Sequence, residues 1–115
     1  MQKNEITVKT LINNIGGKLY GDDSIVITNF SSVENALQNT ASFALNDYCE
    51  DLLLFSKASM LVIAPSNKYL KNIIKERVKK NYATVVFDNP KLFFSRAIPL
   101  INNYIFTKEI MHIDT

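Results

Sequence analysis

Two apolar runs with a basic amphipathic stretch between them constrain the fold of this chain more than any other feature. The runs are MLVIA at residues 60–64 and TVVF at residues 84–87. Continuous apolar or β-branched runs of this length are typical of strands buried on both faces of a sheet. Residues 67–80, capped by Ser66 or Asn67, place apolar side chains every three to four positions, which predicts a helix. The sequence therefore predicts a right-handed βαβ unit with parallel strands, in a small α/β domain whose mixed sheet is flanked by helices.

The length and composition are those of one ordinary globular domain. A chain of 115 residues can bury roughly 65% of its unfolded surface in a single core. Hydrophobic residues make up 47% of the chain and charged residues 21%, which excludes the disordered and coiled-coil classes. The net charge of +2 comes largely from the predicted central helix, at Lys68, Lys71, Lys75, Arg77, Lys79 and Lys80. The inward repeat of this helix runs through Tyr69 or Leu70, Ile73 or Ile74 and Arg77 with Val78, so we interpret the lysines mostly as a solvated outer face. Because Tyr69 and Tyr82 are expected in the core, we predict no nucleic-acid binding.

The chain carries few groups suited to metal or covalent chemistry. Cys49 is the single cysteine and His112 the single histidine, which excludes an internal disulfide and a His/Cys metal site. Ser56, Ser59 and Ser66 have no histidine at a plausible spacing, so we assign no catalytic residue and no cofactor. The polar start and the absence of an apolar run of about 18 residues predict a cytoplasmic chain without a secretory signal or transmembrane segment.

Short helices and strands are predicted on both sides of the βαβ unit. Helices are expected over residues 6–15, for about one turn after residue 31, and over residues 47–57. Extended segments are expected over residues 18–20, 24–30 and 40–45, the first two joined by a turn. In the helix over residues 47–57, Tyr48, Leu52 and Phe55 share one face by their spacing.

A final helix is predicted to begin at Pro90, with Asn89 as its cap. Pro99 removes one backbone donor, so we expect a bend near Ile98. The chain from Leu100 onward is rich in apolar residues, and we expect a partner subunit or a following domain to cover it.

A cluster of aromatic and amide residues before the first buried strand is the candidate binding site. Phe43 and Tyr48 could stack a base, which is worth about 1–3 kcal/mol per base, and Asn46 offers the donor and acceptor that the imide edge of uracil needs. In the alternative interpretation, Phe43 is a core residue on a short strand, Asn46 and Asp47 make a turn, and Tyr48 completes the packing. The residues alone favour this alternative.

Four segments in order resemble one family: GGKLYGDDSIVITNFSSVENA, SFALNDY, LLLFSKASMLVIAP and VVFDNPKLFFSRA. Together they resemble the amino-terminal domain of UDP-3-O-acylglucosamine N-acyltransferases, enzymes of lipid A (lipopolysaccharide) biosynthesis, over about residues 10–97. The resemblance implies a small α/β domain that binds the uridine of a UDP-linked glucosamine substrate. It maps Phe43 and Asn46 onto the uridine site. The family's tyrosine falls at Cys49, and a tyrosine stands one residue earlier at Tyr48, which on a helix turns a side chain by about 100°.

The resemblance also implies parts that we expect to be missing from this chain. Residues 1–106 would form the recognition domain, and residues 107–115 would start the connection to a left-handed β-helix domain. That β-helix carries the family's catalytic histidine and builds its homotrimer, and further helices meet acyl carrier protein. His112 matches an entry residue and not the catalytic base.

Three functional hypotheses follow. The first is a uridine-recognition domain of an N-acyltransferase that moves a 3-hydroxyacyl chain from acyl carrier protein, and this chain alone would not be catalytic. The second is a stand-alone remnant or binding module that has lost the nucleotide, which Cys49 supports. The third is the UDP-binding amino-terminal domain of a peptidoglycan ligase, and ITNFSSVENA lacks the serine-arginine signature expected there.

Overall fold

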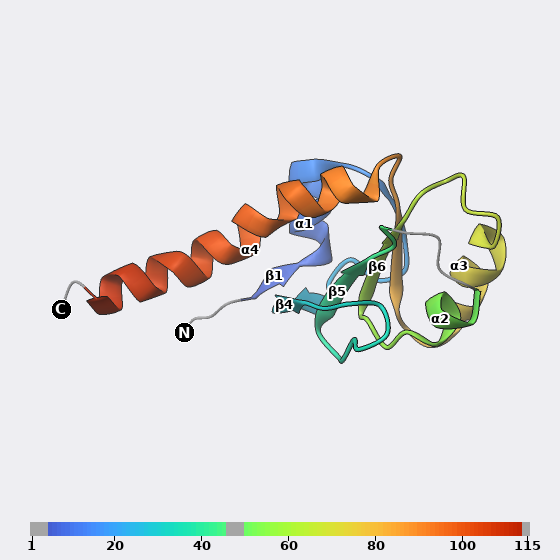
Figure 1. Ribbon diagram of the computed structural model, residues 1–115, viewed down its shortest axis with the longest axis horizontal. Coiled ribbons are helices and arrows are strands. Elements are labelled where there is room, and N and C mark those ends of the chain that lie inside the picture. The colour runs from blue at the N-terminus through green and yellow to red at the C-terminus, as the bar shows by residue number, and fades with distance from the viewer. Residues whose placement is uncertain (1–4, 46–49, 114–115) are drawn as a thin grey trace.

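The computed structural model describes residues 5–45 and 50–113, with the side chains described up to Ile101. A five-stranded mixed sheet forms its centre (Figure 1). In spatial order the strands are β2 (Lys18–Tyr20), β7 (Ala83–Val86), β6 (Met60–Ile63), β5 (Thr40–Phe43) and β4 (Asn29–Phe30). Strand β2 is antiparallel to β7, and all other neighbours are parallel. The predicted α/β class with a mixed sheet is confirmed, and the described residues contain no β-helix.

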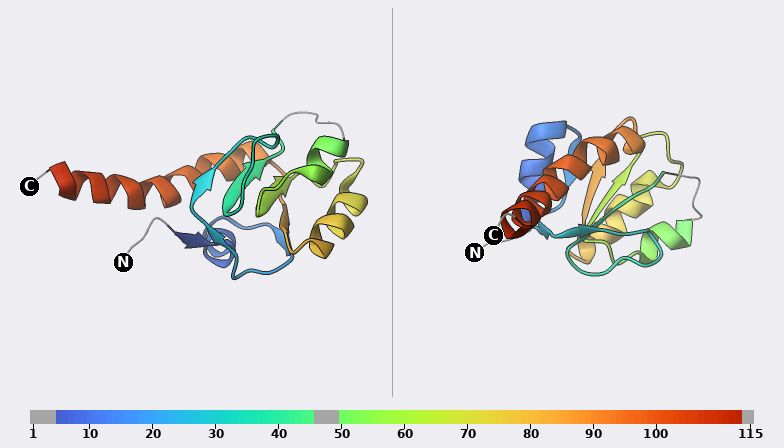
Figure 2. Two further views of the ribbon diagram at one scale, coloured as in Figure 1. Left: turned by 90° about the horizontal axis from the view of Figure 1, so that it is seen from below. Right: turned by 60° about the vertical axis from the view of Figure 1, so that its left-hand side comes forward.

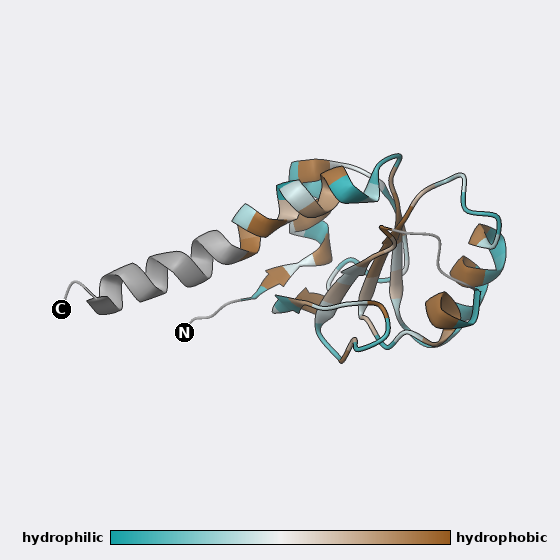
Figure 3. Cartoon of the chain, viewed as in Figure 1, coloured by the Kyte–Doolittle hydropathy of each residue, from teal (hydrophilic) through white to brown (hydrophobic). Residues whose placement is uncertain are grey.

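Helices cover both faces of the sheet (Figures 1 and 2). They are α1 (Val8–Ile15) and α4 (Pro90–Ile113) on one face, and α2 (Glu50–Phe55) and α3 (Leu70–Lys79) on the other. Apolar residues gather in the sheet and in the adjoining helices, and hydrophilic residues follow the loops (Figure 3). This layering leaves the ends of the sheet as the places where polar side chains can meet a ligand.

Strand β6 shows why the MLVI run has no alternation. Met60 and Val62 pack in the core under α1 and α4, whereas Leu61 and Ile63 pack in the core under α2 and α3. All four side chains are 0% exposed, as expected of a central strand covered on both faces. The predicted parallel pairing with the second apolar run is confirmed, since Met60 lies opposite Ala83.

The pairing of the first extended segments differs from the prediction. Strand β2 pairs with β7, and residues 24–30 divide between two sheets. Within that segment β3 (Val26–Ile27) pairs with β1 (Ile6–Thr7), whereas β4 pairs with β5. The expected helical turn after residue 31 is wrong, because residues 31–37 make bends and turns. A segment this short gains too few hydrogen bonds to offset helix nucleation.

The apolar face predicted for the helix over residues 47–57 is also wrong. Leu52 is 39% exposed and Phe55 is 68% exposed, whereas Leu53 is fully buried against the core. Tyr48, the third residue of the predicted face, lies outside the described residues. A six-residue helix has only one or two positions facing the sheet, so its rotation cannot be deduced from spacing alone.

Helix α4 begins as predicted. The Leu92 amide donates to Asn89 Oδ1 at 3.1 Å, which caps the helix. Pro99 does not end the helix, which continues to Ile113. Pro99 lies on the exposed side, where water can satisfy the carbonyl that loses its donor, and the bend near Ile98 stays a prediction. None of the described helices has the combination of length and apolarity that crossing a bilayer requires.

Arg77, on α3, is fully buried and connects the helix to the sheet. Its guanidinium donates to Thr84 Oγ1 at 3.1 Å, to the carbonyl oxygens of Ser56 at 3.2 Å and Ala58 at 2.8 Å, and to that of Ala83 at 3.0 Å. The guanidinium carbon lies 5.0 Å from the centre of the Tyr82 ring. Of the two residues that the helical repeat offered at this inward position, Arg77 is buried and Val78 is 44% exposed.

Burial determines the protonation behaviour of this group. Desolvation lowers the pKa of Arg77 from its ordinary value to about 10, although the Tyr82 phenol opposes the change. A pKa of about 10 keeps the guanidinium charged at neutral pH. The hydrogen bonds to neutral oxygens offset the cost of burying that charge.

Arg77→Met is expected to lower the free energy of unfolding by about 2–4 kcal/mol, because three carbonyls and a buried hydroxyl lose their donors. Urea unfolding followed by circular dichroism measures this loss. Lys79→Met is the matched control on the same helix. Lys79 pairs with Glu76 at 3.3 Å on the surface, so its loss should cost less than about 0.5 kcal/mol. Equal effects of the two substitutions would contradict the role assigned to Arg77.

Candidate functional site

A hollow lies at the carboxyl ends of β4 and β5, where ligands commonly bind in open α/β sheets. We call it the aromatic hollow. Its lining residues are Phe30, Ser31, Ser32, Phe43, Leu45 and Phe94. Its volume is about 310 Å³, which is at the lower end of the range for small-molecule sites.

Three phenylalanine rings form most of the wall. The Phe43 and Phe94 centroids are 4.9 Å apart, and those of Phe30 and Phe94 are 5.6 Å apart with the planes at 84°. Tilted and edge-to-face pairs of this kind are the favoured arrangement of aromatic rings. They hold the rings in place before any ligand arrives.

Phe43 is a core residue as well as part of this wall. It lies on β5, is only 6% exposed and contacts Phe93 in the main core. The interpretation of Phe43 as a core residue on a short strand agrees with the structure. Phe94 is only partly buried and offers more of its surface to the hollow.

The hydroxyls beside the rings form a small network. The Ser42 hydroxyl donates to the Ser31 carbonyl at 2.9 Å, and the Ser31 hydroxyl donates to Thr40 Oγ1 at 3.0 Å. Ser32 is exposed at the edge of the hollow. None of the six lining residues is charged, so the described part of the lining consists of aromatic and aliphatic side chains and the two serines.

The other two predicted site residues, Asn46 and Tyr48, lie outside the described residues, as does Cys49. The chain reaches that segment directly from the hollow, because Leu45 is a lining residue and is 44% exposed. The uridine role of Phe43, Asn46 and Tyr48 therefore stays a prediction.

Sequence reasoning missed Phe30 and Phe94. Phe30 ends β4, and Phe94 stands in the first turns of α4, so 64 positions separate two residues whose rings touch. The only local signal was the pair of adjacent phenylalanines after a strong helix start. Within the described part of the chain, no group of three His, Cys, Asp or Glu side chains is placed to hold a metal ion.

No family model matches the sequence. A curated relative matches it instead. The UDP-3-O-acylglucosamine N-acyltransferase of Methylobacillus flagellatus is 23% identical to this chain over 96 residues. The two chains are distantly related. The match covers 84% of this chain and 25% of the relative, so this chain spans about a quarter of the length of the enzyme it matches.

Phe43→Ala is expected to lower the free energy of unfolding by about 3–5 kcal/mol, because the ring is buried among three others. Phe43→Leu keeps most of the apolar volume and should cost about 1–1.5 kcal/mol. Thermal or urea unfolding compares the two variants. A loss below about 1 kcal/mol for Phe43→Ala would show that the ring belongs to the surface and not to the core.

Proposed function

We propose that this chain is a uridine-recognition domain of an N-acyltransferase that acts on UDP-3-O-acylglucosamine. The observation that carries the proposal is the aromatic hollow around Phe43, found in a chain distantly related to such an enzyme. The substrate would be a UDP-linked glucosamine, and its base would occupy the hollow.

The geometry of the hollow supports a pyrimidine ring. Its volume of about 310 Å³ admits a single ring with its ribose partly outside. Phe94 and Phe43 offer aromatic surface for stacking, which is worth about 1–3 kcal/mol per base. Ser31 and Ser32 bring hydroxyls to the edge, and in this proposal Asn46 binds the imide edge while Tyr48 covers the second face.

Recognition of the uridine would help catalysis by positioning the rest of the substrate. Binding energy from a remote part of a substrate can be used to orient the reacting amine. We propose that residues 1–106 form the recognition domain and that residues 107–115 lead toward a left-handed β-helix with the catalytic histidine. Transfer of the 3-hydroxyacyl chain from acyl carrier protein and assembly of the homotrimer would depend on those other parts. In this proposal the protein acts in the cytoplasm.

One observation favours a second candidate, a binding module that has lost the nucleotide. Cys49 stands where the family resemblance places a tyrosine. Without a second ring, a base would stack on one face only, and its affinity would fall by one stacking contribution.

The test is a two-dimensional NMR titration of the 115-residue chain with UDP-N-acetylglucosamine. Saturable shifts are expected at Ser31, Phe43 and Leu45. UMP should produce the same shifts, and N-acetylglucosamine 1-phosphate should not, because the base is the group that is recognised. If the chain is well folded and its spectrum does not change at millimolar UDP-N-acetylglucosamine, the uridine proposal is contradicted and the second candidate is favoured.

Phe94→Ala should weaken the binding of UMP by about tenfold, because the more accessible ring of the hollow is lost. Phe55→Ala is the matched control: it removes a phenylalanine that is 68% exposed on α2 and does not line the hollow. Unchanged affinity in Phe94→Ala, with its fold verified by circular dichroism, would contradict binding in the hollow.

A further inference from the structure

The cations of this chain are concentrated around helices α2 and α3. Residues 50–80 hold seven Lys and Arg side chains and three carboxylates, whereas the remainder of the chain holds six cations and eight carboxylates. Six of the seven are exposed lysines, and the seventh is the buried Arg77. Helices α2 and α3 lie side by side at one end of the molecule, and the far end of α4 lies at the other (Figure 1). The end that carries α2 and α3 is therefore positive relative to the rest.

Three of the lysines form a line along the outer side of α3. Lys71, Lys75 and Lys79 recur every four residues, and all three are exposed. The two fully buried residues of this helix, Ile73 and Arg77, each stand two positions from Lys75, which is about 160° around the helix. Lys75 therefore points away from the sheet, and the line of ammonium groups faces solvent over about 12 Å.

Helix α2 presents apolar side chains on the same outer surface. Phe55 is 68% exposed and Leu52 is 39% exposed. Phe55 stands two positions from the fully buried Leu53, so its ring also points away from the sheet. Lys80 Nζ lies 5.3 Å from the centre of the Phe55 ring, and this cation–π contact joins the apolar residues of α2 to the cation that ends α3.

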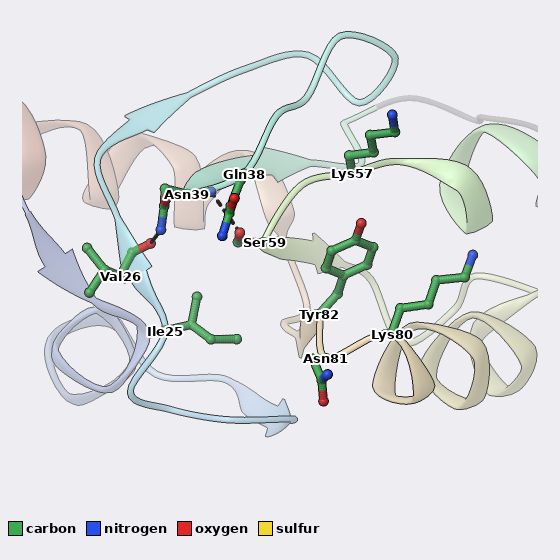
Figure 4. A pocket seen from close by; sticks show the side chains of 9 residues that line it. All are labelled: Ile25, Val26, Gln38, Asn39, Lys57, Ser59, Lys80, Asn81 and Tyr82. Carbon is green, nitrogen blue, oxygen red and sulfur yellow. Dashed lines mark hydrogen bonds between the residues drawn. The ribbon is translucent and has the colours of Figure 1, made fainter.

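Two further lysines at the edge of this surface point outward. Lys57 and Lys80 line a hollow where β5, β6 and β7 begin, but their ammonium groups project out of that hollow (Figure 4). Leu52, Phe55 and the exposed lysines of residues 57–80 thus form one outward surface, which we call the basic face.

The carboxylates near the basic face neutralise only part of its charge. Glu50 Oε2 accepts a hydrogen bond from the Asn72 side-chain amide at 2.9 Å. Glu76 pairs with Lys79 at 3.3 Å, and Asp51 is exposed on α2. Because these three carboxylates oppose six exposed lysines, the basic face keeps an excess of three positive charges.

We propose that the basic face binds an anionic membrane surface. The lysines would lie among the lipid headgroups, and Phe55 and Leu52 would enter the boundary between the headgroups and the acyl chains. Each lysine held close to an anionic leaflet strengthens binding by about fivefold. Several lysines together with an inserted aromatic ring would give reversible attachment of the folded domain.

The composition of the basic face favours a bilayer over an acidic protein. Its exposed cations are all lysines, and the arginine of residues 50–80 is buried. Lysine is depleted in protein–protein interfaces, whereas arginine is enriched. An anionic bilayer attracts charge without requiring the planar, bidentate geometry that arginine provides. The exposed ring of Phe55 adds the apolar contact that membrane-surface helices use.

The basic face is separate from the aromatic hollow. Helices α2 and α3 cover one face of the sheet, whereas Phe94 of the hollow lies on α4, which covers the other. No residue belongs to both surfaces as defined, so membrane binding and uridine binding can be tested independently.

The experiment is sedimentation of the 115-residue chain with vesicles of phosphatidylcholine and phosphatidylglycerol, at an ionic strength of about 0.1 M. Vesicles of phosphatidylcholine alone are the neutral reference. The chain should sediment with the anionic vesicles and stay in solution with the neutral ones. Added salt should weaken the binding, because it screens exposed charges.

Lys71→Gln with Lys75→Gln should weaken binding to the anionic vesicles by at least about tenfold. Lys9→Gln with Lys91→Gln is the matched control, since it removes the same charge from exposed sites on α1 and α4, and it should change the affinity by less than about twofold. Phe55→Ser should weaken binding by about threefold or more, because the inserted ring is lost. Circular dichroism verifies the fold of each variant.

Three results would overturn the proposal. The first is the absence of sedimentation with the anionic vesicles. The second is equal weakening by both pairs of lysine substitutions, which would mean unspecific attraction to the net charge. The third is binding to poly-glutamate as tight as binding to the vesicles, with no effect of Phe55→Ser on either, which would assign the basic face to an acidic protein.

Discussion

The hydrogen bonds of the buried Arg77 guanidinium hold α3 to strands β6 and β7, and this part of the domain depends on them. One side chain from α3 binds the loop before β6 and the start of β7, so the helix and both strands of the βαβ unit meet at a single group. Such a charge is tolerated in a core because each of its three nitrogens donates to an oxygen. The Tyr82 ring packs against the guanidinium and lines a hollow at the end of the sheet where β5, β6 and β7 begin, so the arginine also shapes the surface on that side.

The centre of the fold was predictable from sequence, and its periphery was not. MLVIA and TVVF have to be covered on both faces, which leaves few alternatives to parallel central strands. The partner of β2 could not be found in this way, because pairing across the chain depends on which edge of the sheet remains open. Helical spacing put Arg77 with Val78 at an inward position, but the hydrogen-bond acceptors that let a cation lie there could not be predicted, because they come from distant segments.

Sequence reasoning identified only part of the aromatic hollow. Phe43 was identifiable because an aromatic residue followed closely by an asparagine stands at the end of a predicted strand. Phe30 and Phe94 were not, since the pairing of β4 with β5 brings Phe30 to Phe43 and the packing of α4 on the sheet brings Phe94 there. The hollow at the start of β5, β6 and β7 gave no local signal, because its residues come from separate loops that precede different strands. A site assembled in this way is visible only when the topology places the loops side by side.

Phe43 carries a consequence for comparisons among related chains. Because the ring supports the main core and forms part of the aromatic hollow at once, selection for a stable fold alone would retain an aromatic residue at this position. A relative that no longer binds any nucleotide could therefore keep its phenylalanine for many generations. Divergence between binding and non-binding lineages would show instead at rim positions with no part in the core, such as the exposed Ser32 and Leu45.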